Sequence, residues 1–143
     1  MSNIGCFLKQ NKIRKENVKY PVTASLVGED GKPLEWEIRP ISTAEDNAMR
    51  FECTKNTPHP ENPDLYIPQL QNDKYLPMLI ASSVVEPNLH NAELQDSYEV
   101  RTPEELLLKM VDNPGEYYQF ANFVQEYNGF KNTLQKKIEE VKN

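Results

Sequence analysis

Residues 83–98 read Ser-Val-Val-Glu-Pro-Asn-Leu-His-Asn-Ala-Glu-Leu-Gln-Asp-Ser-Tyr, and the rest of the chain can be placed from this stretch. An uncharged run ends at Val85, and the chain cannot continue as a helix into Pro87, which has no N–H to donate. A turn through Glu86, Pro87 and Asn88 is therefore expected. Asn91 is a favourable N-cap, so a short helix is predicted from Ala92 to Tyr98. The stretch predicts a corner between two helices.

Helix signals continue on the C-terminal side of this corner. Thr102-Pro103-Glu104-Glu105 combines an N-cap, a proline at the first helical position and a glutamate that reaches back, which predicts a helix start. Asn113-Pro114 ends that helix and begins another, which Gly129 stops. The final segment, residues 130–141, has apolar residues at helical spacing, with a narrow seam that fits one partner helix.

The N-terminal side of the corner holds two more helix predictions and a long loop. Ser42-Thr43-Ala44-Glu45 is a capping box, and the helix that it starts is expected to run to about Lys55 with Ala44, Ala48, Phe51, Met49 and Cys53 on its apolar side. Residues 56–71 contain four prolines and no periodicity, which predicts a loop, although Leu65-Tyr66-Ile67 could add a short strand. A helix capped by Asn72 or Asp73 and tolerating Pro77 in its first turn should follow.

A β-hairpin is predicted over residues 20–40. Apolar and polar residues alternate in Val22–Leu26 and Leu34–Arg39, and Asp30-Gly31 between them favours a turn. Leu34, Trp36 and Ile38 should share the buried face. Because a lone hairpin is unstable in water, it must pack on the helices or pair with another strand.

These elements predict one domain over residues 1–143 in the α+β class, mainly α-helical, with one N-terminal β-hairpin packed on about five or six short helices. Its parts are a basic N-terminal arm at 1–17, the hairpin at 20–40, and a helical part at 42–143 that includes the proline-rich loop 56–71. In the arm, Ile4, Phe7 and Leu8 are expected to dock on the domain.

Charge and cysteine content limit the function. The formal net charge is −6, which argues against a general nucleic-acid binder, because such a protein needs a basic surface. Cys6 and Cys53 are far apart and not in metal-ligand spacing, which favours a reducing cytoplasm. The longest uncharged run is about half of what a bilayer crossing needs, so no membrane partner is expected.

No catalytic motif is found in the sequence, which has neither a phosphate-binding glycine loop nor a nucleophile elbow. His59 and His90 fit surface or capping positions better than roles as ligands or general bases. We therefore expect no enzyme activity, no metal and no cofactor.

Candidate partner-binding residues lie on the last two helices. Aromatic residues on the penultimate helix cover an arc wider than one core-facing stripe, so most should be core while Tyr118 or Phe123, at its edges, could contact a partner. The C-terminal seam could pack on its own domain or bind another chain. The candidates are Tyr118, Phe123, Tyr127, Leu134 and Ile138.

Short blocks of the sequence, in order, resemble the XkdN-like tail assembly chaperones of phages and prophages of Gram-positive bacteria. The blocks are Phe7-Leu8-Lys9, Glu16-Asn17, Asp30-Gly31-Lys32-Pro33, Trp36-Glu37-Ile38-Arg39-Pro40, Asn72-Asp73-Lys74-Tyr75-Leu76, Pro87-Asn88-Leu89, Ala92–Tyr98, Pro114-Gly115-Glu116-Tyr117 and Asn128-Gly129-Phe130. The chain departs from the pattern at Glu99, where a small turn residue, commonly Gly, is expected after Tyr98.

The resemblance implies a non-enzymatic role in the cytoplasm of the bacterial host. Such a chaperone would bind the tape measure protein and keep it soluble until the tail tube polymerises, and the tail tube protein and a second copy of the chain are further candidate partners. The alternative is a structural tail component, such as a tube or baseplate accessory, that is retained in the particle.

Overall fold

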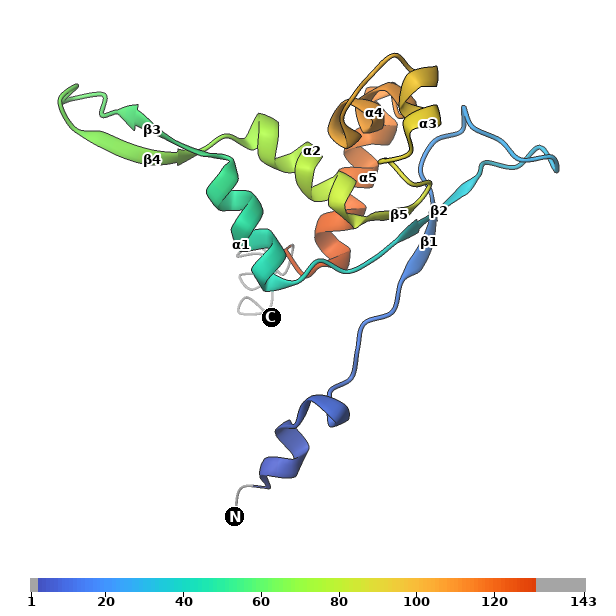
Figure 1. Ribbon diagram of the computed structural model, residues 1–143, viewed down its shortest axis with the longest axis horizontal. Coiled ribbons are helices and arrows are strands. Elements are labelled where there is room, and N and C mark those ends of the chain that lie inside the picture. Colours follow the sequence, from blue (N-terminus) through green and yellow to red (C-terminus); the bar gives the residue numbers. More distant parts are fainter. Residues whose placement is uncertain (1–2, 131–143) are drawn as a thin grey trace, which may run out of the picture.

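The computed structural model describes residues 3–130 (Figure 1). In this part of the chain there are five α-helices, five β-strands and two short 3-10 turns at Ile4–Phe7 and Lys9–Asn11. The predicted C-terminal helix, with Leu134 and Ile138, lies outside the described residues.

A three-stranded antiparallel sheet is formed by β1 (Val18–Pro21), β2 (Glu35–Ile38) and β5 (Val84–Glu86), in the order β1-β2-β5. The register pairs Val18 with Ile38 and Pro21 with Glu35 on one side, and Ile38 with Val84 on the other. The third strand begins directly after a helix, within the stretch predicted as a helical corner. The Glu86–Pro87 peptide bond, which follows β5, is cis.

The hairpin forms with a different first strand from the one predicted. Val22 and Thr23 leave the ladder, and pairing resumes only at an isolated bridge between Val27 and Pro33. The cause is Glu116, whose carboxylate accepts hydrogen bonds from the Thr23 hydroxyl at 2.7 Å and the Ala24 N–H at 2.8 Å. These bonds hold residues 23–24 on the helical part instead of on the neighbouring strand.

The proline-rich segment predicted as a loop is a second, two-stranded antiparallel sheet. Strands β3 (Thr54–Pro58) and β4 (Tyr66–Leu70) pair in continuous register from Thr54 with Leu70 to Pro58 with Tyr66. We call residues 54–70 the ribbon. It projects away from the other sheet and the helices (Figure 1), and most of its residues are exposed.

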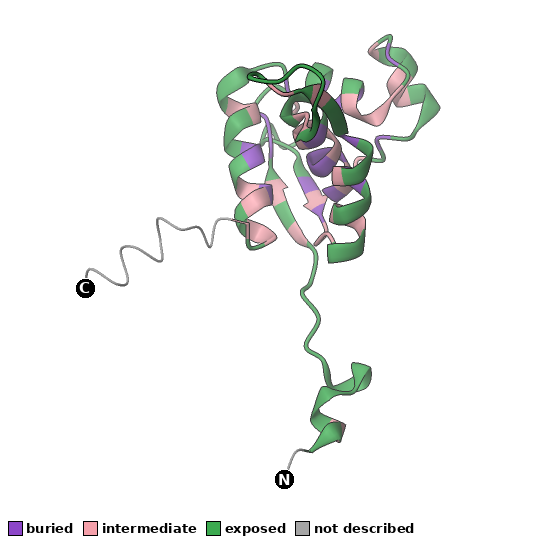
Figure 2. Cartoon of the chain, turned by 90° about the vertical axis from the view of Figure 1, so that its left-hand side faces the viewer, coloured by how far each residue is buried: buried purple, intermediate pink, exposed green. Residues whose placement is uncertain are grey.

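The helices surround a core that also includes the inner face of the three-stranded sheet (Figure 2). They are α1 (Thr43–Glu52), α2 (Asn72–Ser83), α3 (Ala92–Ser97), α4 (Pro103–Met110) and α5 (Pro114–Tyr127). Trp36 and Ile38 of β2 are buried as predicted. The helices supply the other fully buried large apolar side chains, with Leu89 between β5 and α3; these are Leu79, Ile80, Leu89, Leu106, Leu107, Phe120 and Val124.

Helix starts were predicted better than helix faces. The Ser42 capping box and the N-caps Asn91 and Thr102 are present, but α2 is preceded by Gln71 and holds Pro77 in its second turn. The apolar side predicted for α1 was right for Met49 and Cys53, which are buried, and wrong for Ala44, Ala48 and Phe51, which are exposed. Leu34 is also exposed, against prediction, because it lies beyond the part of β2 that packs on the helices.

The turn after α3 contains the departure noted in the sequence. Glu99 has a φ of 58°, in the left-handed region that glycine adopts without steric cost. The position therefore has the backbone geometry of a small turn residue while carrying a glutamate.

The fold prediction was wrong in its β part. The described residues form an α+β fold with two separate sheets, whereas a single hairpin on five or six helices was expected. The strands β3, β4 and β5 have only three to five residues, and β3 and β4 each contain a proline, so they carry too little periodic signal for the sequence to distinguish them from loops.

Candidate interaction surfaces

Two of the predicted partner-binding residues on α5 contribute to an aromatic stack. The ring of Phe123 lies 4.1 Å from that of Tyr20 on β1, and 5.9 Å from that of Tyr127, with nearly parallel planes. Tyr20 also stacks on the buried Phe120 at 5.6 Å. Phe123 is therefore half-buried against β1, and Tyr127, stacked beside it, is half-buried as well.

Tyr127 fastens the N-terminal segment to the C-terminal end of α5. Its hydroxyl donates to the carbonyl oxygen of Glu16, and the Lys15 ammonium donates to the Tyr127 carbonyl oxygen. The same ammonium lies 4.2 Å from the centre of the Tyr127 ring, within the range of a cation–π contact. Burial, and then the charge of Glu16, raise the pKa of the Tyr127 hydroxyl.

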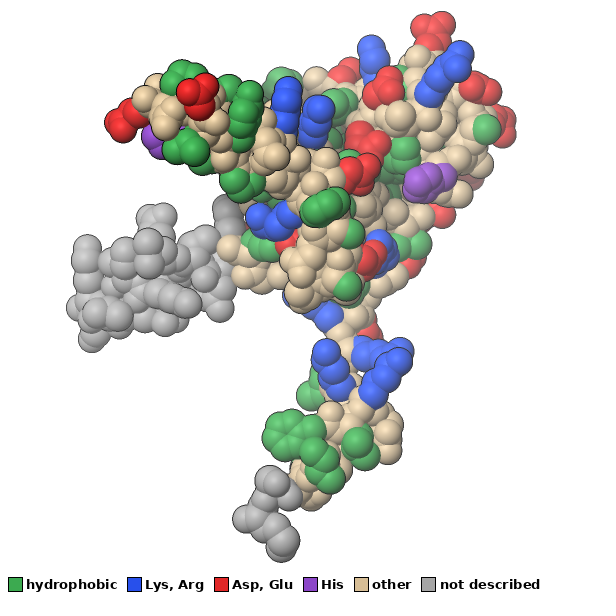
Figure 3. Space-filling view, turned by 60° about the vertical axis from the view of Figure 1, so that its left-hand side comes forward, with side chains coloured by type: hydrophobic (Ala, Val, Ile, Leu, Met, Phe, Trp, Pro, Cys, Tyr) green, Lys and Arg blue, Asp and Glu red, His purple; other side chains and the backbone are tan. Residues whose placement is uncertain are grey.

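Residues 3–14 extend away from the domain beyond this attachment (Figures 1 and 2). From here on, the arm means these residues, which are part of the arm predicted over residues 1–17. The prediction that Ile4, Phe7 and Leu8 dock on the domain was wrong, because these side chains are 72%, 77% and 43% exposed. Between the arm and the domain is an open hollow of about 1030 Å³. The arm thus presents apolar side chains beside the cations Lys9, Lys12 and Arg14 (Figure 3).

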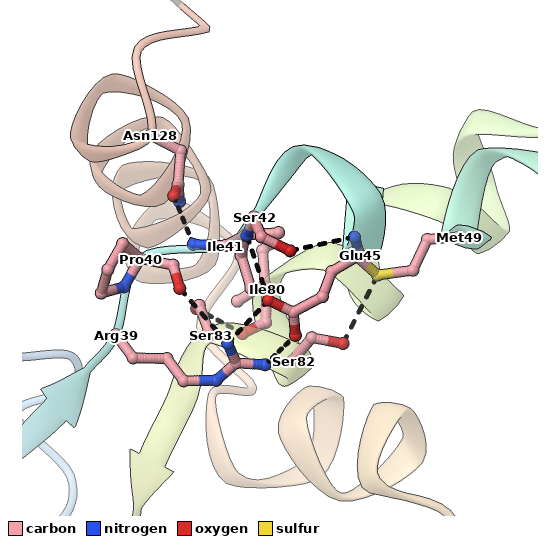
Figure 4. A network of polar contacts seen from close by, with 10 residues as sticks. All are labelled: Arg39, Pro40, Ile41, Ser42, Glu45, Met49, Ile80, Ser82, Ser83 and Asn128. Carbon is pink, nitrogen blue, oxygen red and sulfur yellow. Dashed lines mark hydrogen bonds and ion pairs between the residues drawn. The ribbon is translucent and has the colours of Figure 1, made fainter. Parts of the chain in front are cut away.

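A polar joint holds β2, α1 and α5 together next to this hollow (Figure 4). The Arg39 guanidinium donates to both carboxylate oxygens of Glu45, at 3.1 and 2.6 Å, and Glu45 also accepts from the Ser42 N–H at 3.0 Å. Arg39, followed by the Ser42 N–H, lowers the pKa of the Glu45 carboxyl from 4.5 to about 2. The side-chain oxygen of Asn128 accepts from the Ile41 N–H at 2.7 Å. The joint fixes the end of α5, to which the N-terminal segment is attached.

Tyr118, the third predicted residue, is 62% exposed and lies at the other end of α5. It lines a groove of about 560 Å³ between α4 and the start of α5. We call this the α4–α5 groove. Leu108 and Tyr118 are its exposed apolar side chains, and it also contains Lys109. Its full lining is Val100, Glu105, Leu108, Lys109, Val111, Asp112, Pro114, Tyr117 and Tyr118.

The ribbon is the surface that the sequence predictions largely missed. Tyr66 is 65% exposed on β4, and Leu65 and Ile67 beside it are exposed as well. Phe51, two residues before the chain turns into the ribbon at Cys53, is 87% exposed. The available signal was the apolar triplet Leu65-Tyr66-Ile67 inside a segment otherwise predicted to be a loop.

Neither histidine is part of a candidate metal-binding group in the described part of the chain. His59 lies at the far end of the ribbon, where its Nδ1 accepts from the Glu61 N–H at 3.0 Å, and His90 is exposed in the turn before α3. Among residues 3–130, no group of three or more histidine, cysteine, aspartate or glutamate side chains is arranged to hold a metal ion. No helix in this part is long and apolar enough to cross a membrane.

Comparison with known proteins identifies the class as phage tail assembly chaperones. Residues 4–142 match the family described as Phage XkdN-like tail assembly chaperone protein, TAC, and the chain belongs to this family. The match confirms the family that the sequence blocks indicated, and with it the general role of a phage tail assembly chaperone.

Two curated relatives come from Bacillus subtilis (strain 168). The phage-like element PBSX protein XkdN and the uncharacterized protein YqbN are each 24% identical over 99% of this chain, covering 94% and 93% of their own lengths. A crystal structure of the protein YqbN has a TM-score of 0.77 at 21% identity, and the match covers 92% of this chain and 99% of that one. This likeness supports the fold.

Proposed function

We propose that this tail assembly chaperone binds the tape measure protein and keeps it soluble until the tail tube polymerises around it. The observation that carries the proposal is the position of the exposed apolar side chains. Eight of the thirteen large ones among the described residues lie on the arm, or on the ribbon and Phe51 at its base. Projecting apolar segments can reach around an elongated client.

The client's chemistry explains why such a chaperone is needed. A long, mostly helical protein without its surrounding tube exposes apolar surface and aggregates. Many copies of a small acidic protein would cover that surface and add charge repulsion between coated chains. Each contact should be modest, because the tube must displace the coat, and many contacts along one client make up the affinity.

The prolines of the ribbon disfavour one mode of client binding, in which a client strand pairs with the edge of the ribbon. Backbone hydrogen bonds join His59 to Leu65 and Gln71 to Cys53 at the two ends of the ribbon. By the alternation of an antiparallel ladder, Pro58 and Pro68 then fall at positions that face away from the partner strand. Each outer edge therefore lacks one hydrogen-bond donor, which disfavours pairing with a further strand.

The face of the ribbon that carries Pro58 and Tyr66 is better suited to a client than the edges are. Directly paired residues share a face, so Pro58 and Tyr66 lie together, beside the pair of Asn56 with Pro68. This face continues to Leu70, which is half-buried against the core. It presents proline and tyrosine side chains, which lose little conformational entropy on binding.

The α5 candidates are less accessible. Phe123 is half-buried beneath Tyr20, and Tyr127 is covered by Lys15 and Glu16, so a client would have to displace the N-terminal segment to reach them. Tyr118 is open to a partner in the α4–α5 groove. Contact between these three residues and a client remains a prediction, as does contact through Leu134 and Ile138.

Co-expression with the tape measure protein of the same phage tests the proposal. We expect the tape measure protein to become soluble and to co-purify with this chain. Phe51→Asp and Tyr66→Asp should reduce the co-purified amount, while Val27→Asp, at an exposed apolar site in the β1–β2 loop, should not. Circular dichroism establishes that each variant is folded.

The other outcomes are equally informative. Loss of the client only with Tyr118→Asp would move the client surface from the ribbon to the α4–α5 groove. No interaction, together with detection of the chain in purified tails, would overturn the proposal and favour the alternative of a structural tail component.

A further inference from the structure

Two regions on opposite sides of the structure carry opposite charge. The arm and its attachment, residues 3–17, hold Lys9, Lys12, Arg14 and Lys15 against Glu16, a formal charge of +3. Residues 92–116, from α3 to the first turn of α5, hold seven acidic and two basic side chains, a formal charge of −5. Figure 1 shows the arm at the bottom and α3 and α4 at the top.

The same two regions also have complementary apolar features. Ile13 in the arm is 94% exposed and lies between Lys12 and Arg14. In the α4–α5 groove the exposed apolar side chains are Leu108 and Tyr118, and the lining includes Glu105 and Asp112. An apolar side chain flanked by two cations thus has, in the same sequence, an apolar groove whose border carries two carboxylates against the one ammonium of Lys109, a net negative charge.

We propose that the arm of one copy docks in the α4–α5 groove of a second copy, with Ile13 against Leu108 and Tyr118. Lys12 and Arg14 then face Glu105 and Asp112, and their long side chains reach the rim while Ile13 enters the groove. Burial of Ile13 supplies an apolar driving force, and the paired charges fix orientation and speed the encounter.

The arm's attachment argues against docking within one chain. Lys15 is held at Tyr127, and Tyr118 lies nine residues earlier on α5, which is about 14 Å along the helix axis. Ile13 is two residues from Lys15, which adds only about 7 Å of extended backbone. The nine residues between Tyr127 and Tyr118 are also about two and a half turns, which places these two positions on opposite sides of α5. While this attachment holds, the groove within reach of Ile13 belongs to another copy.

The contact is heterologous, because a different surface is used on each copy. The second copy's own arm stays free after its groove is filled, so a third copy can add. Copies would form an open series or a closed ring. The proposal does not depend on the identity of any client, and it is tested without one.

Sedimentation velocity of the full-length chain alone, across a wide concentration range, measures the association. We expect concentration-dependent oligomers that weaken as salt is raised. Ile13→Asp and Leu108→Asp should each weaken the association about tenfold or more. Val27→Asp, at an apolar site that is exposed like Leu108 and lies outside both surfaces, should leave it unchanged.

Mixing the two defective variants gives the decisive result. Ile13→Asp retains a groove and Leu108→Asp retains an arm, so an equimolar mixture should form a one-to-one dimer that cannot grow. This dimer should form at concentrations at which either variant alone stays monomeric. A wild-type chain that stays monomeric at every concentration would overturn the proposal. So would a mixture that forms no dimer, or an Ile13→Asp variant that associates like wild type.

Discussion

Replacement of Phe120 by alanine should remove the centre of the aromatic core. The Phe120 ring is 0% exposed, stacks on Tyr20 at 5.6 Å and meets Trp36 edge to face at 5.8 Å. Truncating a buried phenylalanine costs about 3–5 kcal/mol, from lost burial and the cavity left behind. Because two aromatic contacts disappear as well, we expect about 4 kcal/mol.

Urea unfolding measures this loss, and Trp36 is a convenient probe because it is the single tryptophan and contacts Phe120. With a slope of about 2 kcal/mol per molar urea, the midpoint should fall by about 2 M. Phe51→Ala is the matched control, since this phenylalanine also lies on a helix but is 87% exposed. Its unfolding free energy should change by less than about 0.5 kcal/mol.

Equal shifts for the two variants, or a loss below about 1 kcal/mol for Phe120→Ala, would refute the packing argument. If Phe120→Ala does not fold at all, Phe120→Leu provides a graded test. That change keeps most of the apolar volume and should cost about 1–2 kcal/mol. Its Trp36 emission should also shift, because the edge-to-face contact is lost.

Three further outcomes follow from single side chains. Glu99→Gly should stabilise the fold by about 0.5–1 kcal/mol in urea unfolding, because relief of the left-handed strain outweighs the extra freedom of the unfolded chain; a destabilised variant would contradict this. Glu45→Gln should lower stability at neutral pH by about 0.5–1 kcal/mol, since the pair with Arg39 is partly exposed. Because the folded pKa of Glu45 is about 2 against a usual 4.5, this contribution is present above pH 4.5, and the wild-type advantage should vanish as the pH falls toward 2. A thiol reagent should titrate only the exposed Cys6 in the native chain, with Cys53 reacting on unfolding, because Cys53 is buried and burial raises its pKa; reaction of both thiols at one rate would show that the α1 end is open.

Local signals in the sequence were sufficient for four of the five helix starts; the exception is α2, which follows Gln71 where Asn72 or Asp73 was the predicted cap. Ser42 with Glu45, Asn91, Thr102 and Asn113 each cap a helix, because an N-cap acts within one turn and needs no distant partner. The burial of Trp36 and Ile38 also followed from local alternation. The family resemblance, carried by short ordered blocks, was confirmed over residues 4–142.

Long-range contacts decided what local patterns could not. The first strand is Val18–Pro21 because Glu116, more than ninety residues away in the sequence, holds Thr23 and Ala24 on α5. The ribbon was predicted as a loop because its prolines break the local periodicity, although proline is tolerated on edge strands.

The candidate binding surfaces, too, were determined partly by the sequence and partly by tertiary contacts. The sequence by itself determined which residues are apolar and which are charged, and so named Tyr118, Phe123 and Tyr127 as candidates. Only the tertiary structure decided that Phe123 lies half-buried against β1 and Tyr127 against the segment that leads into it, while Tyr118, Tyr66 and Ile13 remain exposed. Exposure depends on which segments fold back on one another, and it is set by contacts between residues far apart in the chain.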